Sequence, residues 1–195
     1  MLVAVILSGG ASSRMGSPKA LLPYQGRPFL EHLLEVTVHP KIGVRRVVLG
    51  SDAERIAKTI PLPADDIVIN DGWEQGQLSS IQAAIRSLPA GTDGVLLCLI
   101  DHPLISGALV VDLIEAFYAA PTNITLPVYE GRRGHPVIFP ASLYDDLLHA
   151  PLEKGARAVV WAHAGNVTEV STTEQGCVLN LNDPETMQRA LGKVD

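Results

Sequence analysis

A segment near the N-terminus combines small residues with two cations, a combination that suits phosphate binding. Glycines let the backbone approach a ligand closely, so several N–H groups can converge on phosphate oxygens. Arg14 adds a bidentate fork and Lys19 a compact point charge. A flexible turn with solvated charges would have a similar composition. The candidate phosphate-binding residues of this segment, named here the phosphate loop (residues 8–19), are Ser8, Gly9, Gly10, Ser12, Ser13, Arg14 and Lys19.

The phosphate loop matches neither of two common nucleotide-binding patterns. Gly10 and Gly16 lie six residues apart and Ser17 follows, so G-x-x-x-x-G-K-[ST] is absent. The dinucleotide pattern G-x-G-x-x-G is absent as well. The loop therefore predicts phosphate binding of another kind.

Asp101 is the candidate metal ligand. It follows residues 94–100, the longest and most apolar run of the chain, which predicts a buried strand. A carboxylate at the carboxyl edge of such a strand is well placed to hold Mg²⁺, a cation that prefers oxygen ligands. The alternative is an aspartate that caps the helix expected after Ser106. The neighbouring His102 is expected to be structural.

Polar side chains within residues 70–81 form a second candidate group. Ser79 and Ser80 lie near the start of an expected helix, where hydroxyls commonly cap the first turn. The same hydroxyls could border a ligand. Trp73 and Trp161 could stack on rings or pack at the rim of the core.

The elements that must position these residues alternate between strand and helix. Short apolar runs predict strands that are covered on both faces, at residues 2–7, 44–49, 66–70 and 94–100. Helical spacing lies between and after them, at residues 28–38, 52–59, 78–88 and 106–119. This order predicts a three-layer α/β/α sandwich with a mostly parallel central sheet. Ligands of such sheets bind beyond the carboxyl ends of the strands.

After Pro121 the pattern changes to a hairpin-like excursion around a polar turn. Strands are expected at 124–128, 135–139, 167–170 and 177–181, and helices at 141–148 and 156–163. A last helix is expected from Pro184, with Asp183 as its N-cap. Because no repeat, low-complexity tract or linker interrupts the chain, we expect a single domain over residues 1–195.

Composition restricts the class of partner. The chain has 195 residues and a formal net charge of −6, which argues against a general nucleic-acid or membrane surface. No stretch reaches the roughly 18 apolar residues that a membrane span requires, and the first residues lack a basic leader. We therefore expect a cytoplasmic protein with no nucleic-acid and no membrane partner. Cys98, inside an apolar run, is expected to be a buried free thiol.

The phosphate loop also carries a resemblance to a known family. The chain from Leu7 to Lys19 resembles the pattern L-x-x-G-x-S-x-R-M-G-x-x-K of the molybdenum cofactor nucleotidyltransferases. The resemblance implies a Rossmann-like nucleotidyltransferase fold. It further implies that the loop from Leu7 onward surrounds a nucleoside triphosphate, which Arg14 and Lys19 neutralise. The residues that it places beside the base and sugar are Asn70, Gly76, Ser79 and Ser80.

The same resemblance implies roles further along the chain. Asp101 stands in a D-x-P element and would bind the catalytic Mg²⁺. The family's second metal position falls on Asn182, where an amide replaces the usual carboxylate, so we expect weakened metal binding rather than lost activity. Residues 131–136 resemble the R-x-G-H-P element that faces the acceptor. Arg133, Gly134 and His135 are therefore expected at the acceptor phosphate, although a solvated hairpin tip would also suit the arginine.

The predicted activity is Mg²⁺-dependent transfer of a nucleoside monophosphate from an NTP to a phosphate acceptor, with release of pyrophosphate. The S-x-R-M-G-x-x-K spacing and the G-H-P element resemble the branch that transfers cytidylyl groups to molybdopterin, which favours CTP. The Gly9-Gly10 pair resembles the guanylyl branch, which keeps GTP open. Transfer to a sugar or alcohol phosphate also stays open, as does a non-catalytic module that binds nucleotide and delivers cofactor. A molybdoenzyme or its chaperone would receive the product.

Overall fold

The computed structural model describes residues 1–192. Strands and helices alternate along the chain, as the sequence predicts. The strands of the main sheet are β1 Leu2–Ser8, β4 Ile42–Leu49, β5 Ile67–Ile69, β6 Gly94–Leu99, β7 Ile124–Tyr129, β8 Arg132–Arg133, β9 Val137–Pro140 and β10 Val167–Ser171, and β2 Pro23–Tyr24 pairs with β3 Arg27–Pro28 in a small second sheet. The α-helices are α1 Phe29–Val36, α2 Ala53–Thr59, α3 Gln77–Arg86, α4 Gly107–Ala119, α5 Tyr144–His149, α6 Arg157–Ala162 and α7 Pro184–Leu191.

The main sheet is mostly parallel. Its strand order is β10-β7-β9-β6-β1-β4-β5, with β8 paired to β7 at one end. Strands β6, β1, β4 and β5 run parallel to one another, and β9 runs antiparallel to both of its neighbours. Parallel neighbours need crossover helices, and these helices are what cover the faces of the sheet.

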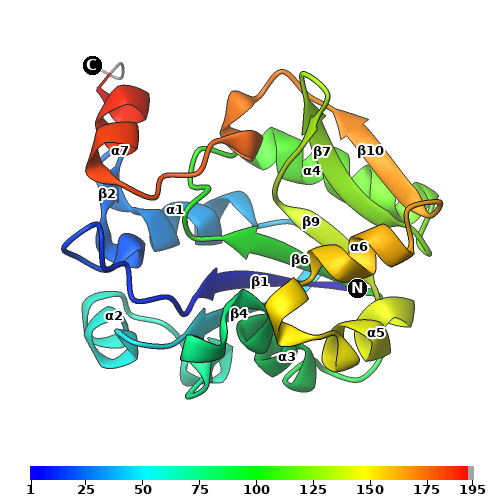
Figure 1. Ribbon diagram of the computed structural model, residues 1–195, viewed down its shortest axis with the longest axis horizontal. Helices are drawn as coiled ribbons and strands as arrows, with labels where there is room; N and C mark the ends of the chain where they lie inside the picture. Colours follow the sequence, from blue (N-terminus) through cyan, green and yellow to red (C-terminus); the bar gives the residue numbers. More distant parts are fainter. Residues whose placement is uncertain (193–195) are drawn as a thin grey trace.

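Helices cover both faces of the sheet, as Figure 1 shows. Alternate residues of β1 point to opposite faces, so Ala4 and Ile6 pack with α1 and α4, whereas Val3 and Val5 pack with α3 and α5. Both apolar clusters lie against the same strand, so every residue of β1 is buried. The predicted three-layer α/β/α arrangement is confirmed.

The hairpin after Pro121 is confirmed, with an addition. Val128 and Tyr129 of β7 pair with Arg133 and Arg132 of β8. The chain then turns back, and β9 inserts between β7 and β6, where it pairs with four residues of β6. The excursion therefore widens the main sheet instead of standing apart from it.

One predicted strand is wrong. Residues 177–181 pair with no strand among the described residues, and the 3₁₀ turn η6 Gln175–Val178 occupies the start of this segment. Cys177 and Leu181 are buried all the same, in the cluster that contains α1 and α4, and Val178 and Leu179 pack against that cluster. The apolar pattern therefore reflects burial, without strand pairing. Cys98 and Cys177 are both buried free thiols.

The last helix begins as the sequence predicts. The Asp183 side chain accepts a hydrogen bond from the Thr186 N–H, and Pro184 occupies the first helical turn. In Figure 1 the red α7 lies beside the blue N-terminal segment, and Met187 shares a surface depression with Met15 of the phosphate loop. Among the described residues, no helix is long and apolar enough to cross a membrane.

Candidate functional site

The predicted site residues converge on a cleft of about 330 Å³ at the carboxyl ends of β1 and β6. These two strands are neighbours in register, with Leu7 beside Leu99, so the loops that leave them meet at one edge of the sheet. Most of the predicted nucleotide-binding residues line the cleft together with both predicted metal ligands. Its lining consists of Leu7, Gly9, Gly10, Ser12, Ser13, Arg14, Lys19, Trp73, Glu74, Gly76, Gln77, Ser80, Leu99, Ile100, Asp101 and Asn182.

The phosphate loop is held in shape by Ser12. Its hydroxyl accepts a hydrogen bond from the Lys19 N–H (3.1 Å), and its carbonyl accepts one from the Met15 N–H (2.8 Å). Ser12 itself has a left-handed backbone, with φ near 49°, a conformation that costs free energy in residues other than glycine. The loop therefore forms a defined turn rather than a flexible tether.

Gly9 allows the phosphate loop to lie directly against α3. A Cβ at this position would stand 2.8 Å from the Ser80 hydroxyl oxygen, nearer than real Cβ contacts come. The loop and the start of α3 thus form opposite walls of the cleft. Ser8, at the end of β1, is buried and does not line the cleft.

Lys19 lies between the two predicted metal ligands. Its ammonium donates a hydrogen bond to the Asn182 side-chain oxygen and lies 3.6 Å from an Asp101 carboxylate oxygen. The Lys19 side chain is only 11% exposed and that of Asp101 20%. A backbone hydrogen bond from the Leu181 N–H to the Asp101 carbonyl (2.8 Å) brings the late segment to this place.

Burial also changes the acidity of Lys19. Loss of solvation lowers the pKa of its ammonium, and the neighbouring Asp101 carboxylate opposes that change. Arg14 lowers the Lys19 pKa further, since a second cation nearby disfavours the charged form. An incoming polyphosphate would relieve this repulsion between the two cations.

The oxygen atoms around Lys19 fit a divalent cation. The second carboxylate oxygen of Asp101 is buried and has no hydrogen-bond partner. Such an orphaned acceptor costs free energy unless a cation or donor reaches it. Among residues 1–192 there is no cluster of three His, Cys, Asp or Glu side chains that could hold a metal by themselves. Asp101 and Asn182 therefore offer two oxygens, which suits Mg²⁺, a cation that takes its remaining ligands from phosphates and water.

Asp101 is not a helix cap. The N-cap of α4 is Ser106, whose hydroxyl oxygen accepts a hydrogen bond from the Leu109 N–H. The capping role considered for Asp101 is thus wrong.

The residues at the start of α3 divide into two groups. The Asn70 amide donates to the hydroxyls of Ser79 (2.9 Å) and Ser80 (3.0 Å), and Ser79 donates to the carbonyls of Gly72 and Gly76. These bonds close the turn that carries Trp73. Ser80 and Gly76 line the cleft, whereas Asn70 and Ser79 lie behind them, outside its lining.

The predicted acceptor residues line a second cavity, of about 710 Å³, next to the cleft. Gln77 and Leu99 belong to the linings of both, so the two spaces adjoin. Arg133, Gly134 and His135 all line the second cavity. Arg133 is partly exposed and donates to Glu169 (2.7 Å). Arg133 therefore has features of both predicted environments. It belongs to the hairpin tip, where it pairs with Glu169, and it also lines a cavity.

His135 lines the second cavity and lies close to His102. Its ring centroid lies 5.1 Å from that of His102, the residue after Asp101. Burial lowers the pKa of His135 to about 4, and the nearby His102 lowers it further. Burial likewise lowers the pKa of His102, against the raising effect of Asp101. Near neutral pH, both rings are neutral.

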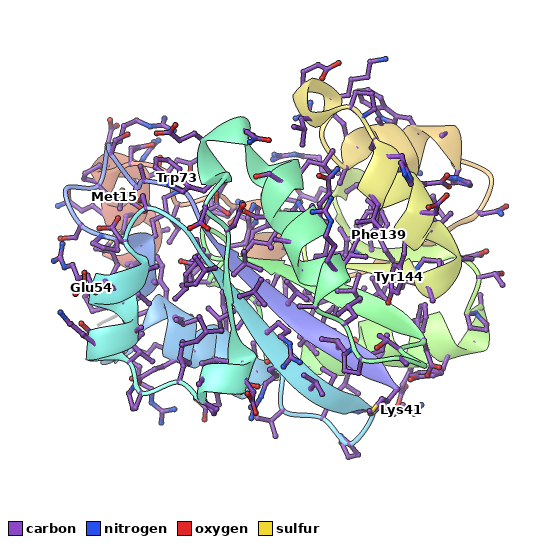
Figure 2. The ribbon with its side chains drawn as sticks, turned by 90° about the horizontal axis from the view of Figure 1, so that it is seen from below. Met15, Lys41, Glu54, Trp73, Phe139 and Tyr144 are labelled. Carbon is purple, nitrogen blue, oxygen red and sulfur yellow. The ribbon has the colours of Figure 1, made fainter. Side chains whose placement is uncertain are left out.

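Several lining residues were not predicted as site residues. They include Glu74 and Gln77 in the cleft, and Lys154 and Arg157 in the second cavity. Glu74 and Gln77 could have been found from the sequence, because they follow the third predicted strand and lie close to the predicted nucleotide-binding residues of the chain. Figure 2 shows Trp73 at the same end of the molecule as Met15, whereas Phe139, which lines the second cavity, lies toward α5 and α6.

Comparisons with known proteins identify the family of this chain. Residues 4–167 match the family described as "MobA-like NTP transferase domain". A molybdenum cofactor guanylyltransferase of Rhizobium meliloti (strain 1021) is 31% identical, over 96% of this chain and 89% of its own length. A nicotine blue oxidoreductase of Paenarthrobacter nicotinovorans is 31% identical, over 73% of this chain and 72% of its own. The crystal structure of Rv0371c from Mycobacterium tuberculosis H37Rv matches with a TM-score of 0.85 and 25% identity, over 98% of this chain and 97% of that one. The chain therefore belongs to the MobA-like NTP transferase family and has the Rossmann-like α/β fold of the nucleotidyltransferases.

Proposed function

We propose that this nucleotidyltransferase transfers a nucleoside monophosphate from CTP or GTP to a phosphorylated acceptor, with molybdopterin as the acceptor, and releases pyrophosphate. One observation carries the proposal. The cations Arg14 and Lys19 share one cleft with the oxygens of Asp101 and Asn182 at the carboxyl edge of the sheet, and a second cavity adjoins it. A donor and an acceptor can thus be held side by side.

The reaction needs little covalent chemistry from the protein. An acceptor phosphate oxygen attacks the α-phosphorus of the nucleotide, a new P–O bond forms, and the bond to the β-phosphate breaks so that pyrophosphate leaves. A phosphate monoester is largely ionised near neutral pH, so no general base is required. Catalysis then depends on positioning and on neutralising the negative charge that accumulates.

Arg14 and Lys19 are proposed to bind the β- and γ-phosphates. They are the two cations that line the cleft, and charge-assisted bonds to phosphate are the strongest that such side chains make. The backbone N–H groups of Gly9 and Gly10 would add dipoles on the same side. On this assignment the leaving pyrophosphate stays in contact with both cations.

Asp101 and Asn182 are proposed to hold Mg²⁺. When bound, the ion would polarise the α-phosphate and partly neutralise its charge. The Asp101 oxygen without a hydrogen-bond partner could reach the ion directly. The Asn182 oxygen could do so once Lys19 turns to the triphosphate, which is a stronger partner for its ammonium. Asn182 contributes a dipole but no charge, so the site is expected to bind the ion more weakly than a pair of carboxylates would.

The nucleotide base is the point on which two observations differ. The S-x-R-M-G-x-x-K spacing and the G-H-P element favour CTP, which we propose as the donor. The guanylyltransferase named among the relatives covers nearly the whole chain and favours GTP as the second candidate. An oxidoreductase activity, the one named for another relative, is less consistent with a loop that lacks the dinucleotide pattern G-x-G-x-x-G.

A thermal-shift comparison of CTP, GTP, ATP and UTP, each with Mg²⁺, tests the donor. A ligand at 100 times its dissociation constant stabilises the native state by about 2.7 kcal/mol, which corresponds to roughly 5–10 °C for a chain of this size. We expect this shift for CTP or GTP and its loss in Asp101→Asn. The exposed variant Glu54→Gln is the matched control. Preference for ATP or UTP contradicts the molybdopterin assignment.

Pyrophosphate release tests transfer itself. With the preferred nucleotide, release should depend on molybdopterin, and glucose 1-phosphate should not replace it. Tight nucleotide binding without release would instead support a non-catalytic delivery module. The recipient molybdoenzyme or chaperone, and the cytoplasmic location, stay predictions from the sequence.

A further inference from the structure

A surface depression of about 350 Å³ lies between α7 and the phosphate loop. Two of its lining residues are methionines from distant parts of the chain. Met15 belongs to the phosphate loop and Met187 to α7, and both side chains are partly exposed. In Figure 2 the labelled Met15 lies beside α7, drawn in faint red, in agreement with Figure 1. The lining consists of Met15, Leu22, Pro184, Met187, Gln188 and Leu191.

Helix α7 is docked through one narrow face. Met187, Ala190 and Leu191 pack against the core cluster that contains α1 and α4, and their spacing of three and four residues places them on the same side of the helix. No residue of α7 is fully buried. The exposed Glu185 and Arg189 pair with each other away from this face. A helix held by so few buried apolar contacts opens at low free-energy cost, so a polar change at Met187 is expected to release it.

The docking of α7 also bears on the cleft, because Asn182 comes two residues before the helix. On one side, Leu181 is fully buried and its N–H donates to the Asp101 carbonyl (2.8 Å). On the other side, Asp183 is the N-cap of α7. Asn182, whose side-chain oxygen contacts Lys19, thus lies between a residue that the core holds and one that α7 holds. Release of α7 removes the second of these constraints.

Methionine is an apolar residue that a peroxide makes polar. Hydrogen peroxide transfers one oxygen atom to the thioether sulfur: the O–O bond breaks, an S–O bond forms, and water leaves. The sulfoxide is polar, and methionine sulfoxide reductases reverse the step. Among the residues that line the depression, Gln188 alone has a side-chain hydrogen-bond donor. A sulfoxide in the depression would therefore be poorly satisfied and would turn toward water, which opposes docking of the helix.

The other sulfur atoms of the chain are less suited to this role. Cys98 and Cys177 are buried, and burial raises the pKa of both thiols, so the reactive thiolate is scarce. Met1 is 53% exposed, but it precedes β1, whose opposite end leads into the phosphate loop. Met15 is held within its own turn, because its N–H donates to the Ser12 carbonyl (2.8 Å). Met187 is thus the sulfur on which docking of α7 depends.

We propose that Met187 is a redox-sensitive modification site: hydrogen peroxide converts it to the sulfoxide, α7 separates from the phosphate loop, and Asn182 is no longer held in the cleft. Reduction of the sulfoxide restores the docked helix. The inference concerns regulation of the cleft, and its effect on catalysis rests on the proposed function. The modification and the release of α7 do not.

Amide hydrogen exchange followed by mass spectrometry, on the full chain before and after hydrogen peroxide, tests the release of α7. Peptide masses report which methionine has gained an oxygen atom. We expect oxidation of Met187 to be accompanied by loss of exchange protection in residues 184–191, while the amides of β1 stay protected. A methionine sulfoxide reductase should restore the protection. Pyrophosphate release should fall by roughly tenfold to a hundredfold, since small displacements of positioned groups have effects of this size.

Two variants of Met187 separate oxidation from other effects of peroxide. Met187→Leu has nearly the same volume and no sulfur, so α7 should keep its protection in peroxide. Met187→Gln places a polar group of similar length at the same position, and α7 should lose protection without peroxide. The matched control is Arg189→Gln, on the exposed side of the same helix, which should show the same protection and the same response to peroxide as the unmodified chain.

Three outcomes overturn the inference: protection of α7 that persists when Met187 is oxidised, equal loss of protection in Met187→Leu, or a loss that follows oxidation of another residue and that the reductase does not reverse. Exchange and peptide masses require neither nucleotide nor acceptor. If the chain transfers no nucleotide, these measurements still decide whether α7 responds to oxidation. The failure of this inference is thus distinguishable from the failure of the proposed function.

Discussion

Lys19 shows how one side chain can serve two states of a site. Its ammonium contacts Asn182 and lies 3.6 Å from one Asp101 carboxylate oxygen, so it lies beside two of the oxygens that are proposed to hold a metal ion. The contact gives these two part-buried oxygens a partner, whereas the other Asp101 oxygen is buried and has none. When a triphosphate enters, the ammonium can move to the phosphates and leave the oxygens to the ion.

Lys19→Met tests this dual role, because methionine keeps most of the length of the side chain without its charge. We expect kcat/KM for pyrophosphate release to fall by about 10²-fold or more, as when one stabilising donor is removed from other active sites. In the absence of nucleotide, we expect Mn²⁺ to bind more tightly than in the unmodified protein, since the competing cation is gone. Steady-state kinetics and Mn²⁺ titration followed by electron paramagnetic resonance measure the two effects.

The matched control is Lys58→Met, which removes an exposed lysine of α2 that pairs with Glu54. It should change neither quantity. Weaker Mn²⁺ binding in Lys19→Met would show that the lysine supports the metal site instead of competing for it.

At the scale of elements, the site depends on a segment that belongs to no strand and no α-helix. Residues 175–182 run from η6 across the ends of β6 and β9, and they carry Asn182 to Asp101. Two backbone hydrogen bonds hold the segment, from the His135 N–H to the Cys177 carbonyl (2.8 Å) and from the Leu181 N–H to the Asp101 carbonyl (2.8 Å). Residues 175–182 therefore connect the hairpin with the cleft through their backbone.

Gly134→Ala should disturb the backbone of residues 175–182. A Cβ at Gly134 would stand 2.4 Å from the Cys177 carbonyl oxygen, a backbone atom that cannot rotate away. We expect a loss of about 1–3 kcal/mol in the free energy of unfolding, as for other overpacked positions, measured by urea denaturation. Gly165→Ala, where a Cβ would meet nothing within 4 Å, should cost less. Equal effects of the two variants would contradict the close approach.

At the scale of the whole molecule, folding places ionisable rings out of water at the centre of the site. His102 follows Asp101 in the chain and His135 lines the second cavity, and burial lowers the pKa of both. Folding thus disfavours protonation of these two histidine rings, which can be protonated at an ordinary histidine pKa in the unfolded chain. The arrangement keeps two neutral rings near Asp101 at the cost of stability in acid.

The free energy of unfolding should fall as the pH drops from about 6.5 to about 4. In this window the unfolded chain, with an ordinary histidine pKa of 6.5, binds a proton that folded His135, with a pKa of about 4, does not. Stability is therefore fully present above this window and is lost as the pH falls through it. Melting temperatures at several pH values measure the slope, which His135→Gln should flatten.

The control for this pH dependence is His149→Gln, at an exposed histidine of α5. It should leave the slope as it is. A slope that is the same with and without His135 would contradict the assignment. The carboxyl pKa values of Asp93 and Asp183 are also lowered. They affect the free energy of unfolding only below the pH range in which His135 does.

Much of this architecture follows from local patterns. The apolar runs of β1, β4 and β6 and the Asp183–Pro184 start of α7 depend on burial and capping chemistry that neighbouring residues express by themselves. The phosphate loop is likewise contiguous, so its glycines and cations could be recognised together. That residues 1–195 form one domain stays a prediction, as do the individual ligand roles.

Tertiary structure alone decided which distant residues meet. Nothing near Lys19 in the chain predicts its contact with Asn182, 163 residues away, and nothing near Trp161 predicts a cavity that also contains His135. Residues 177–181 look like a strand because burial selects the same apolar residues whether or not a strand pairs beside them. The sequence by itself thus predicted a phosphate-binding loop and determined the layers, because both depend on residues close together in the chain. The proximity of Asp101 and Asn182 to Lys19, and the second cavity with its tryptophan, depend on how the strands are ordered, which only the folded chain fixes.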